Sequence, residues 1–148
     1  MTSPPAVLTA EQGAEVLLVE DDAQEAELAL DALRRVRGGV RVAVARDGEE
    51  ALDFVLGRGG PVAGLRLILL DLKLPKIDGF DVLSALKSDA AARVIPVVIL
   101  TASKIDQDVL RSYRLGANGY VVKPVDFEEF SEAVRRLSAF WLVLNRGV

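Results

Sequence analysis

The stretch LILLDLKLPKIDG, residues 67–79, joins an unbroken run of branched apolar residues to a carboxylate and a turn sequence. A short apolar run of this kind predicts a strand that is buried on both faces, as in a parallel sheet. Asp71 ends the run, and Pro75 and the pair Asp78-Gly79 supply the residues that a turn needs. Because the turn does not require Asp71, a chemical role for this carboxylate is the alternative to a turn-forming one.

Strand and helix patterns alternate along the whole chain around this stretch. Apolar runs predict strands at residues 15–20, 41–45, 65–71, 96–101 and 118–122. Helical spacing of apolar residues predicts helices at residues 23–36, 48–56, 80–87, 106–115 and 126–144, and GRGGPVAG at 57–64 predicts a loop. Alternating strand–helix units predict an α/β domain with a parallel sheet covered on both faces.

The chain length of 148 residues fits one folded domain, expected at residues 15–148 after a flexible leader at residues 1–14. An Asp followed three residues later by Glu, as in Asp22-Ala-Gln-Glu25, predicts a helix cap, and the pattern recurs at 47–50 and 126–129. The sequence has no signal peptide pattern and no apolar run near the ~20 residues that a membrane span needs. A cytoplasmic protein without a membrane contact is therefore expected.

Composition excludes several kinds of chemistry. The chain has no cysteine and no histidine, which removes thiol nucleophiles, disulfides and the commonest base at neutral pH. A metal, if bound, should be a hard cation held by oxygen ligands. The net charge of −4 argues against nonspecific binding to nucleic acid, and the arginines at 34, 35, 37 and 41 suit a helix C-terminus without any such role.

Polar side chains fall at the ends of the predicted strands. They are Glu20 and Asp21 after the first strand, Asp71 at the end of the third, Thr101 at the end of the fourth and Lys123 after the fifth. The carboxyl ends of parallel strands share one edge of a sheet, where ligands bind, so these side chains are expected to converge there.

A metal ion explains why three carboxylates would gather at one place. Two like charges about 4 Å apart cost on the order of 4 kcal/mol at an effective dielectric constant of 20. Mg²⁺, or Mn²⁺ in its place, removes this repulsion and binds carboxylates together with phosphate oxygens. The pattern therefore predicts phosphoryl transfer, with Asp71 as nucleophile and with Lys123 and Thr101 contacting the phosphoryl group.

These residues carry a resemblance to a known family. The motifs VEDD (19–22), LLDLKLPKIDGFDVL (69–83), VVILTAS (97–103) and GANGYVVKPVD (116–126) together resemble the receiver domain of two-component response regulators. The resemblance implies a flavodoxin-like (βα)5 fold with the strand order 2-1-3-4-5. It also implies a single-domain phosphoacceptor protein that is not an enzyme beyond assisting its own phosphorylation and dephosphorylation.

The resemblance also implies a role for each matching residue. By position, Glu20 and Asp21 match the metal-binding pair, Asp71 the phosphoacceptor, the Lys73 backbone carbonyl a further metal ligand, Thr101 the switch hydroxyl, Tyr120 the switch aromatic and Lys123 the phosphoryl contact. The bond between Lys123 and Pro124 is expected to be cis, as in the family, although trans is the ordinary preference. A downstream protein would recognise the phosphorylated state.

The C-terminal segments FEEF (127–130), AVRRL (133–137) and FWLVL (140–144) resemble single-domain receivers that are paired with phytochrome histidine kinases. This second resemblance implies a light-sensing kinase as the phosphodonor. Apolar residues on several faces near the end of the last helix also predict a homodimer interface that includes Phe140, Trp141 and Leu144. The alternative is that these side chains fold back onto their own domain.

Two other functions are open at this point. Phosphatases of the haloacid-dehalogenase type also use a strand-end aspartate, but they need a second acid two residues later, where this chain has Lys73. A receiver-like protein that never takes phosphate would have no need of the acidic group at Glu20, Asp21 and Asp71, so the intact group argues against it.

Overall fold

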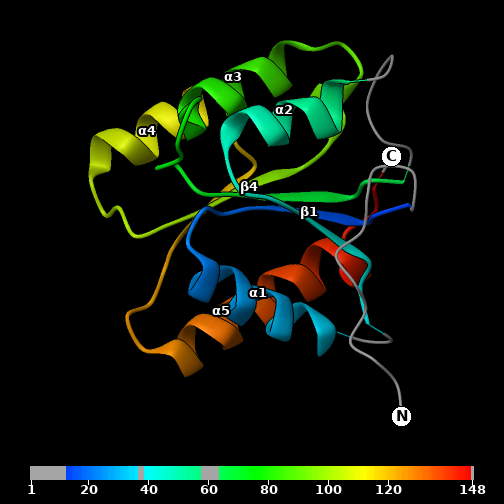
Figure 1. Ribbon diagram of the computed structural model, residues 1–148, viewed down its shortest axis with the longest axis vertical. Helices are drawn as coiled ribbons and strands as arrows, with labels where there is room; N and C mark the ends of the chain where they lie inside the picture. The colour runs from blue at the N-terminus through cyan, green and yellow to red at the C-terminus, as the bar shows by residue number, and fades with distance from the viewer. Residues whose placement is uncertain (1–12, 37–38, 58–63, 148) are drawn as a thin grey trace.

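The computed structural model describes residues 13–36, 39–57 and 64–147, which form a five-stranded parallel sheet with helices on both faces (Figure 1). The strand order β2-β1-β3-β4-β5 confirms the predicted α/β fold and its topology. The strands are β1 (Val16–Val19), β2 (Val42–Ala45), β3 (Leu67–Leu70), β4 (Val97–Thr101) and β5 (Gly119–Val122). Each observed strand lies within its predicted range.

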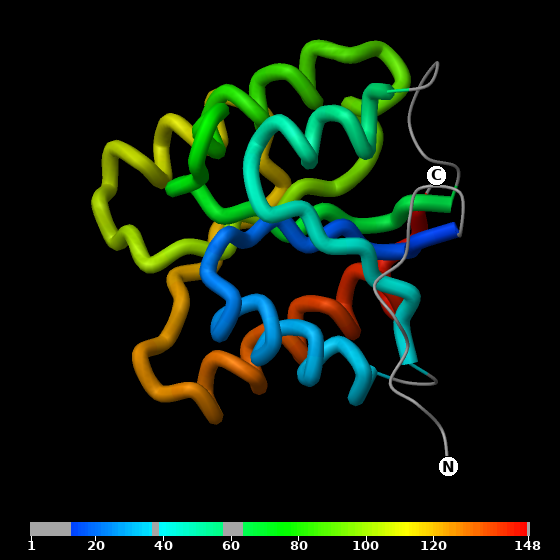
Figure 2. The backbone as a smooth tube through the Cα atoms, in the orientation of Figure 1, coloured from blue at the N-terminus to red at the C-terminus, as the bar shows by residue number. Residues whose placement is uncertain are grey.

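Helices cover the two faces of the sheet unequally. They are α1 (Ala23–Arg34), α2 (Gly48–Leu56), α3 (Gly79–Ser88), α4 (Asp106–Arg114) and α5 (Phe127–Ala139), with a short 3-10 turn, η2 (Ala92–Val94), that the sequence analysis did not predict. Figure 1 shows α1 and α5 packed together on one face and α2, α3 and α4 on the other. In the trace of Figure 2, the chain leaves the sheet face covered by α1 after β2, and it returns to that face at α5.

The strands are buried on both faces, as their composition predicts. In β1, Val16 and Leu18 belong to the apolar core under α1 and α5, whereas Leu17 and Val19 belong to the core under α2 and α3. The residues of β3 alternate between the same two cores, and all residues of β1 and β3 are buried. Because successive side chains point to opposite faces, an unbroken apolar run serves both cores at once.

The register of the sheet brings the strand ends together. Val19 of β1 pairs with Leu70 of β3, and Thr101 of β4 pairs with Val122 of β5. The backbone N–H of Asp71 donates to the Val19 carbonyl at 3.2 Å, one residue beyond the β3 strand. The residues that follow each strand are therefore held at one edge of the sheet by backbone hydrogen bonds.

Aspartates cap the helices that leave this edge. Asp22, Asp47 and Asp126 each accept a hydrogen bond from the backbone N–H three residues later, which confirms the predicted caps. Asp78 caps α3 in the same way. Each cap stabilises its helix by about 0.5–2 kcal/mol and fixes where the helix begins.

The C-terminal helix differs from its prediction. The α-helix ends at Ala139, and residues 140–144 form a π-helical turn, η3 (Phe140–Leu144), closed by the Asn145 N–H donating to the Phe140 carbonyl at 2.7 Å. Consecutive apolar residues cannot all face one side of an α-helix. The wider turn buries Leu142 in the core under α1 and α5 and packs Trp141 against it.

The beginning of the domain also differs slightly from the prediction. Ala14, assigned to the flexible leader, is fully buried in the core under α2 and α3, so it belongs to the domain. The leader residues 1–12 and residues 58–63 of the predicted loop lie outside the described residues. Among the residues that the structure describes, no helix is both long and apolar enough to cross a membrane.

Candidate functional site

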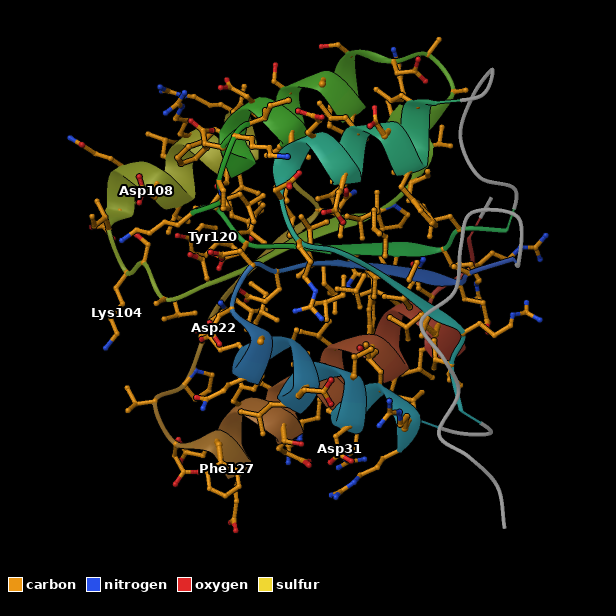
Figure 3. All side chains as sticks on the ribbon, viewed as in Figure 1. Asp22, Asp31, Lys104, Asp108, Tyr120 and Phe127 are labelled. Atoms are coloured by element: carbon orange, nitrogen blue, oxygen red, sulfur yellow. The ribbon has the colours of Figure 1, made fainter. Side chains whose placement is uncertain are left out.

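Polar side chains meet at the carboxyl edge of an otherwise apolar sheet. Glu20, Asp71, Thr101 and Lys123, all predicted to converge there, are buried with exposed fractions of 3%, 8%, 1% and 7%. Asp22 and Tyr120, labelled in Figure 3, lie at this same end of the sheet. Asp21, predicted to join the group, is instead exposed.

Lys123 connects the buried acids. Its ammonium nitrogen lies 2.6 Å from Glu20 Oε1 and 2.9 Å from Asp71 Oδ2. A further carboxylate, that of Glu25 in α1, lies 3.2 Å from the same nitrogen. The other Glu20 oxygen accepts a hydrogen bond from the Asp22 N–H at 3.1 Å, so the buried carboxylate is satisfied on both sides.

Burial and neighbouring charges alter the protonation of this group. Burial raises the pKa of Glu20 to about 7, and the negative charge of Asp71 adds to the increase, although Lys123 opposes it. Burial alone would lower the pKa of Lys123, but its hydrogen bond to Glu20 and the charge of Asp71 outweigh burial and raise it. The ammonium therefore stays charged at neutral pH, where Glu20 is close to its midpoint.

The carboxylates around Lys123 also fit a divalent cation. Carboxylate oxygens of Glu20, Glu25 and Asp71 all lie within 4.8 Å of one another. When all three are ionised, the single ammonium of Lys123 leaves two negative charges uncompensated. An excess of oxygen ligands and negative charge is the environment that Mg²⁺ and Mn²⁺ prefer. Glu25 was missed as a site residue, because its place in the capping pattern at 22–25 already explained it.

A cavity of about 550 Å³ is lined by residues that follow the buried acids in the chain, among them Asp21 after Glu20 and Leu72 after Asp71. Asp21 and Lys73 line this cavity together with Phe80 and Arg111. The Arg111 guanidinium lies 4.1 Å from the centre of the Phe80 ring, which fixes one wall. The backbone N–H of Lys73 points back to Asp71 Oδ1 at 3.4 Å. Asp21 and Lys73 thus lie on the wall of a cavity, one residue after Glu20 and two residues after Asp71 in the chain.

A second hydrogen-bonded chain joins Thr101 to Tyr120. Ser103 donates its backbone N–H to the Thr101 hydroxyl at 3.5 Å, and its carbonyl accepts from the Tyr120 hydroxyl at 3.0 Å. The Ser103 hydroxyl donates to Asp108 at 2.6 Å, which ties the loop to the first turn of α4. Ser103 lies in the motif at 97–103 but had no predicted role, and Asp108 was not predicted as a site residue because an acid in a first helical turn is common.

The expected cis bond after Lys123 is wrong for this structure. No peptide bond among the described residues is cis, so the Lys123–Pro124 bond is trans. The trans form is the ordinary preference by about 0.5–1 kcal/mol. With this bond trans, the Lys123 ammonium still reaches Glu20 and Asp71.

The residues predicted for a dimer interface are divided between core and surface. Phe140 and Leu144 are 47% and 76% exposed, and Val143 between them is also exposed. Trp141 is half-buried against the core and meets the Phe140 ring edge-on, with centroids 5.1 Å apart. Trp141 thus folds back onto its own domain, as the alternative reading allowed, while Phe140 and Leu144 face outward.

Comparison with known proteins gives a consistent result. The family profile of the response regulator receiver domain matches residues 16–135. Rcp1, a response regulator of Synechocystis sp., is 36% identical over 129 residues, which cover 86% of this chain and 88% of Rcp1. The "Probable methanogenesis regulatory protein FilR2" of Methanothrix harundinacea is 43% identical over 142 residues, or 95% of this chain and 92% of that protein.

Solved structures agree with these relatives. The phosphorylated cyanobacterial phytochrome response regulator RcpA superposes with a TM-score of 0.84 at 34% identity, over 90% of this chain and 97% of RcpA. The Mn²⁺-bound form of Rcp1 superposes with a TM-score of 0.81 at 34% identity, over 91% of this chain and 99% of that one. One of these relatives was thus crystallised with a phosphoryl group and the other with a divalent metal.

Proposed function

The chain belongs to the response regulator receiver domain family, and we propose that Asp71 accepts a phosphoryl group from a histidine kinase. The observation that carries this proposal is the buried Asp71 carboxylate, hydrogen bonded at 2.9 Å to Lys123 inside an acidic group. A carboxylate at a strand end with a cation beside it is arranged to receive an anionic phosphoryl group.

The chemistry needs little beyond positioning and charge. The transition state of phosphoryl transfer is loose, so neutralising the phosphoryl oxygens matters more than activating the nucleophile. An Asp71 oxygen bonds to phosphorus as the nitrogen–phosphorus bond of phosphohistidine breaks and the imidazole leaves. A carboxylate needs no base for this attack, which suits a chain without histidine.

Lys123 and a metal ion would divide the neutralisation. Lys123 donates to a phosphoryl oxygen from the side of β5, and the Thr101 hydroxyl donates from the side of β4. Mg²⁺, if bound, would supply further positive charge for the phosphoryl oxygens, and Glu20, Asp21, Asp71 and the Lys73 carbonyl would hold it. The exposed position of Asp21 leaves its carboxylate accessible to a cation from solvent.

Phosphorylation would change the surface through the loop after β4. As Thr101 moves towards the phosphoryl group, Ser103 follows, because its N–H is bonded to the Thr101 hydroxyl. Tyr120 and α4 are bonded to Ser103 and would shift with it. A downstream protein that binds the face formed by α4, β5 and α5 would distinguish the two states.

We further propose that the phosphodonor is a phytochrome histidine kinase and that the protein acts in the cytoplasm as a homodimer. The likeness to the phytochrome response regulator RcpA supports the donor. The exposed apolar side chains of Phe140, Val143 and Leu144 support a dimer. Transfer from a phosphorylated phytochrome kinase should be at least an order of magnitude faster than from a histidine kinase of another class. Equal rates would contradict the phytochrome pairing.

Mass spectrometry tests the phosphoacceptor directly. The protein incubated with acetyl phosphate and Mg²⁺ should gain one acid-labile phosphoryl group, and Asp71→Asn should gain none. Asp81→Asn, which removes an exposed carboxylate from α3, is the matched control and should behave as wild type. Full phosphorylation of Asp71→Asn would contradict the assignment.

A further inference from the structure

The Lys123 ammonium has all of its donors occupied. An ammonium carries three N–H donors and no acceptor, and carboxylates of Glu20, Asp71 and Glu25 lie 2.6, 2.9 and 3.2 Å from its nitrogen. Another acceptor, such as a phosphoryl oxygen, can therefore bind only when one of these carboxylates is released. The identity of the released partner decides how readily Lys123 serves Asp71.

Glu25 is the partner that is released at the lowest cost. It makes the longest of the contacts, and its side chain is 39% exposed, against 5% for Glu20 and 10% for Asp71. A released Glu25 carboxylate returns to water, whereas Glu20 would remain buried with an unpaired charge. Asp71 itself carries the incoming group, so it stays next to Lys123.

The start of α1 directs Glu25 towards Lys123. In a complete capping box, the Glu25 carboxylate would accept the N–H of Asp22. Here the Asp22 N–H donates to Glu20 Oε2 at 3.1 Å instead, while the Glu25 N–H still donates to Asp22 Oδ1 at 2.9 Å. Glu20 thus takes over the reciprocal contact of the cap, and the Glu25 carboxylate remains available for the ammonium.

We propose that Glu25 is a positioning residue that holds Lys123 in the unphosphorylated protein and yields it to the phosphoryl group on Asp71. This inference rests on the phosphorylation of Asp71 proposed above. Glu25 then opposes phosphorylation, because its contact with Lys123 must break each time Asp71 is phosphorylated. Removing the Glu25 carboxylate leaves a donor free and should make the phosphorylated state easier to reach.

The test compares two glutamates at equivalent positions of two helices. Glu25→Gln replaces the charged partner of Lys123 by a neutral amide oxygen, which is a weaker acceptor. Glu129→Gln makes the same change at the third position of α5, where the backbone is capped alike by Asp126. Beryllium trifluoride, which mimics a phosphoryl group on a carboxylate, is titrated in Mg²⁺ with each variant. Glu25→Gln should bind it about two- to five-fold more tightly than wild type, the range of a partly exposed ion pair, and Glu129→Gln should be unchanged.

Further readouts separate the possible failures. Glu25→Asp, which keeps the charge but is too short for the contact, should behave as Glu25→Gln, and the nitrogen NMR signal of the Lys123 ammonium should shift in both. If Glu25→Gln and Glu129→Gln bind beryllium trifluoride equally well, and Asp71 is phosphorylated, the role proposed for Glu25 is wrong. The phosphoacceptor assignment would then still hold. Weaker binding together with a loss of Mg²⁺ affinity would make Glu25 a metal ligand and would also overturn it. A wild-type protein that takes no phosphate on Asp71 would overturn both proposals.

Discussion

The Lys123 ammonium lies 2.6 Å from the Glu20 carboxylate, and both side chains are almost fully buried. A buried ion pair contributes little net stability when it is intact, because desolvation offsets the attraction. Loss of one partner is costly, because the other charge is left buried and unpaired. The site therefore responds strongly to pH and to any change of a single charge.

The first prediction concerns pH. The pKa of Glu20 in the folded protein, about 7, is above its ordinary value of 4.5, so the folded state binds an additional proton between these values. Its stabilising contribution is full below pH 4.5 and is lost as pH rises through 7. In the presence of a chelator, the free energy of unfolding from urea titrations should decrease by on the order of 1–3 kcal/mol between pH 5 and 8.

Glu20→Gln, which is neutral at every pH, is the control for this titration. The difference between wild type and the variant isolates Glu20 from the other carboxylates. The decrease should be absent in Glu20→Gln and should be reduced in wild type by Mg²⁺, which favours the ionised carboxylate. Parallel pH profiles for the two proteins would contradict a raised pKa at Glu20.

The second prediction concerns the loss of the ammonium. Lys123→Met leaves Glu20 and Asp71 without their cation and should reduce the free energy of unfolding by about 3–5 kcal/mol in chelator. Because a divalent cation can replace the missing charge, Mg²⁺ should raise the melting temperature of Lys123→Met more than that of wild type. Lys104→Met, at an exposed position of the loop after β4, is the control. An equal or smaller Mg²⁺ effect in Lys123→Met would be evidence against metal binding at this group.

The third prediction uses two serines that are both fully buried. The Ser138 hydroxyl in α5 has no hydrogen-bond partner among the described residues, whereas the Ser112 hydroxyl in α4 donates to the Asp108 carbonyl at 2.8 Å. Ser138→Ala removes an unsatisfied polar group and should raise the free energy of unfolding by about 1 kcal/mol. Ser112→Ala removes a satisfied one and should lower it by about 1 kcal/mol. If urea titrations showed that the free energy of unfolding changes in the same direction for both variants, this prediction would be wrong.

The fourth prediction concerns the homodimer. Phe140 and Leu144 are exposed on the π-helical turn, so their joint replacement by serine should weaken a dimer without disturbing the core. Sedimentation equilibrium should find a dimer for wild type and a monomer for the double variant. Leu110→Ser, at an exposed apolar position of α4, should remain a dimer. A monomeric wild type would refute the dimer, and a monomeric Leu110→Ser would place the interface on α4 instead.

Periodicity made the sheet and most of the site predictable. The run at 67–70 could be recognised as a strand because its residues supply both cores. Once the sheet is parallel, the positions of Glu20, Asp71, Thr101 and Lys123 follow from the strand ends alone. No measurement of a side chain is needed for that step, because backbone direction brings these residues to one edge.

The features that were missed depend on contacts between distant segments. The direction of Glu25 depends on Lys123, 98 residues later, and a local capping pattern gives no sign of it. The trans bond at Lys123–Pro124 depends on surrounding packing, because either isomer is compatible with a Lys-Pro pair. Residues 140–144 are all apolar, and an α-helix cannot bury all of them on one side. The sequence shows this difficulty, but it does not show that a π-helical turn forms there.

The partners in the central ion pair, Glu20 and Lys123, are 103 residues apart in the chain. A chain in which β5 has not yet docked beside β4 contains the acceptor carboxylate but lacks the ammonium next to it. Under the phosphorylation proposed for Asp71, an incompletely folded molecule, or one truncated before its fifth strand, would lack the Lys123 contact and would be a poor acceptor. The proposed phosphoryl transfer would therefore depend on the docking of β5, the strand that precedes Lys123, at the edge of the sheet.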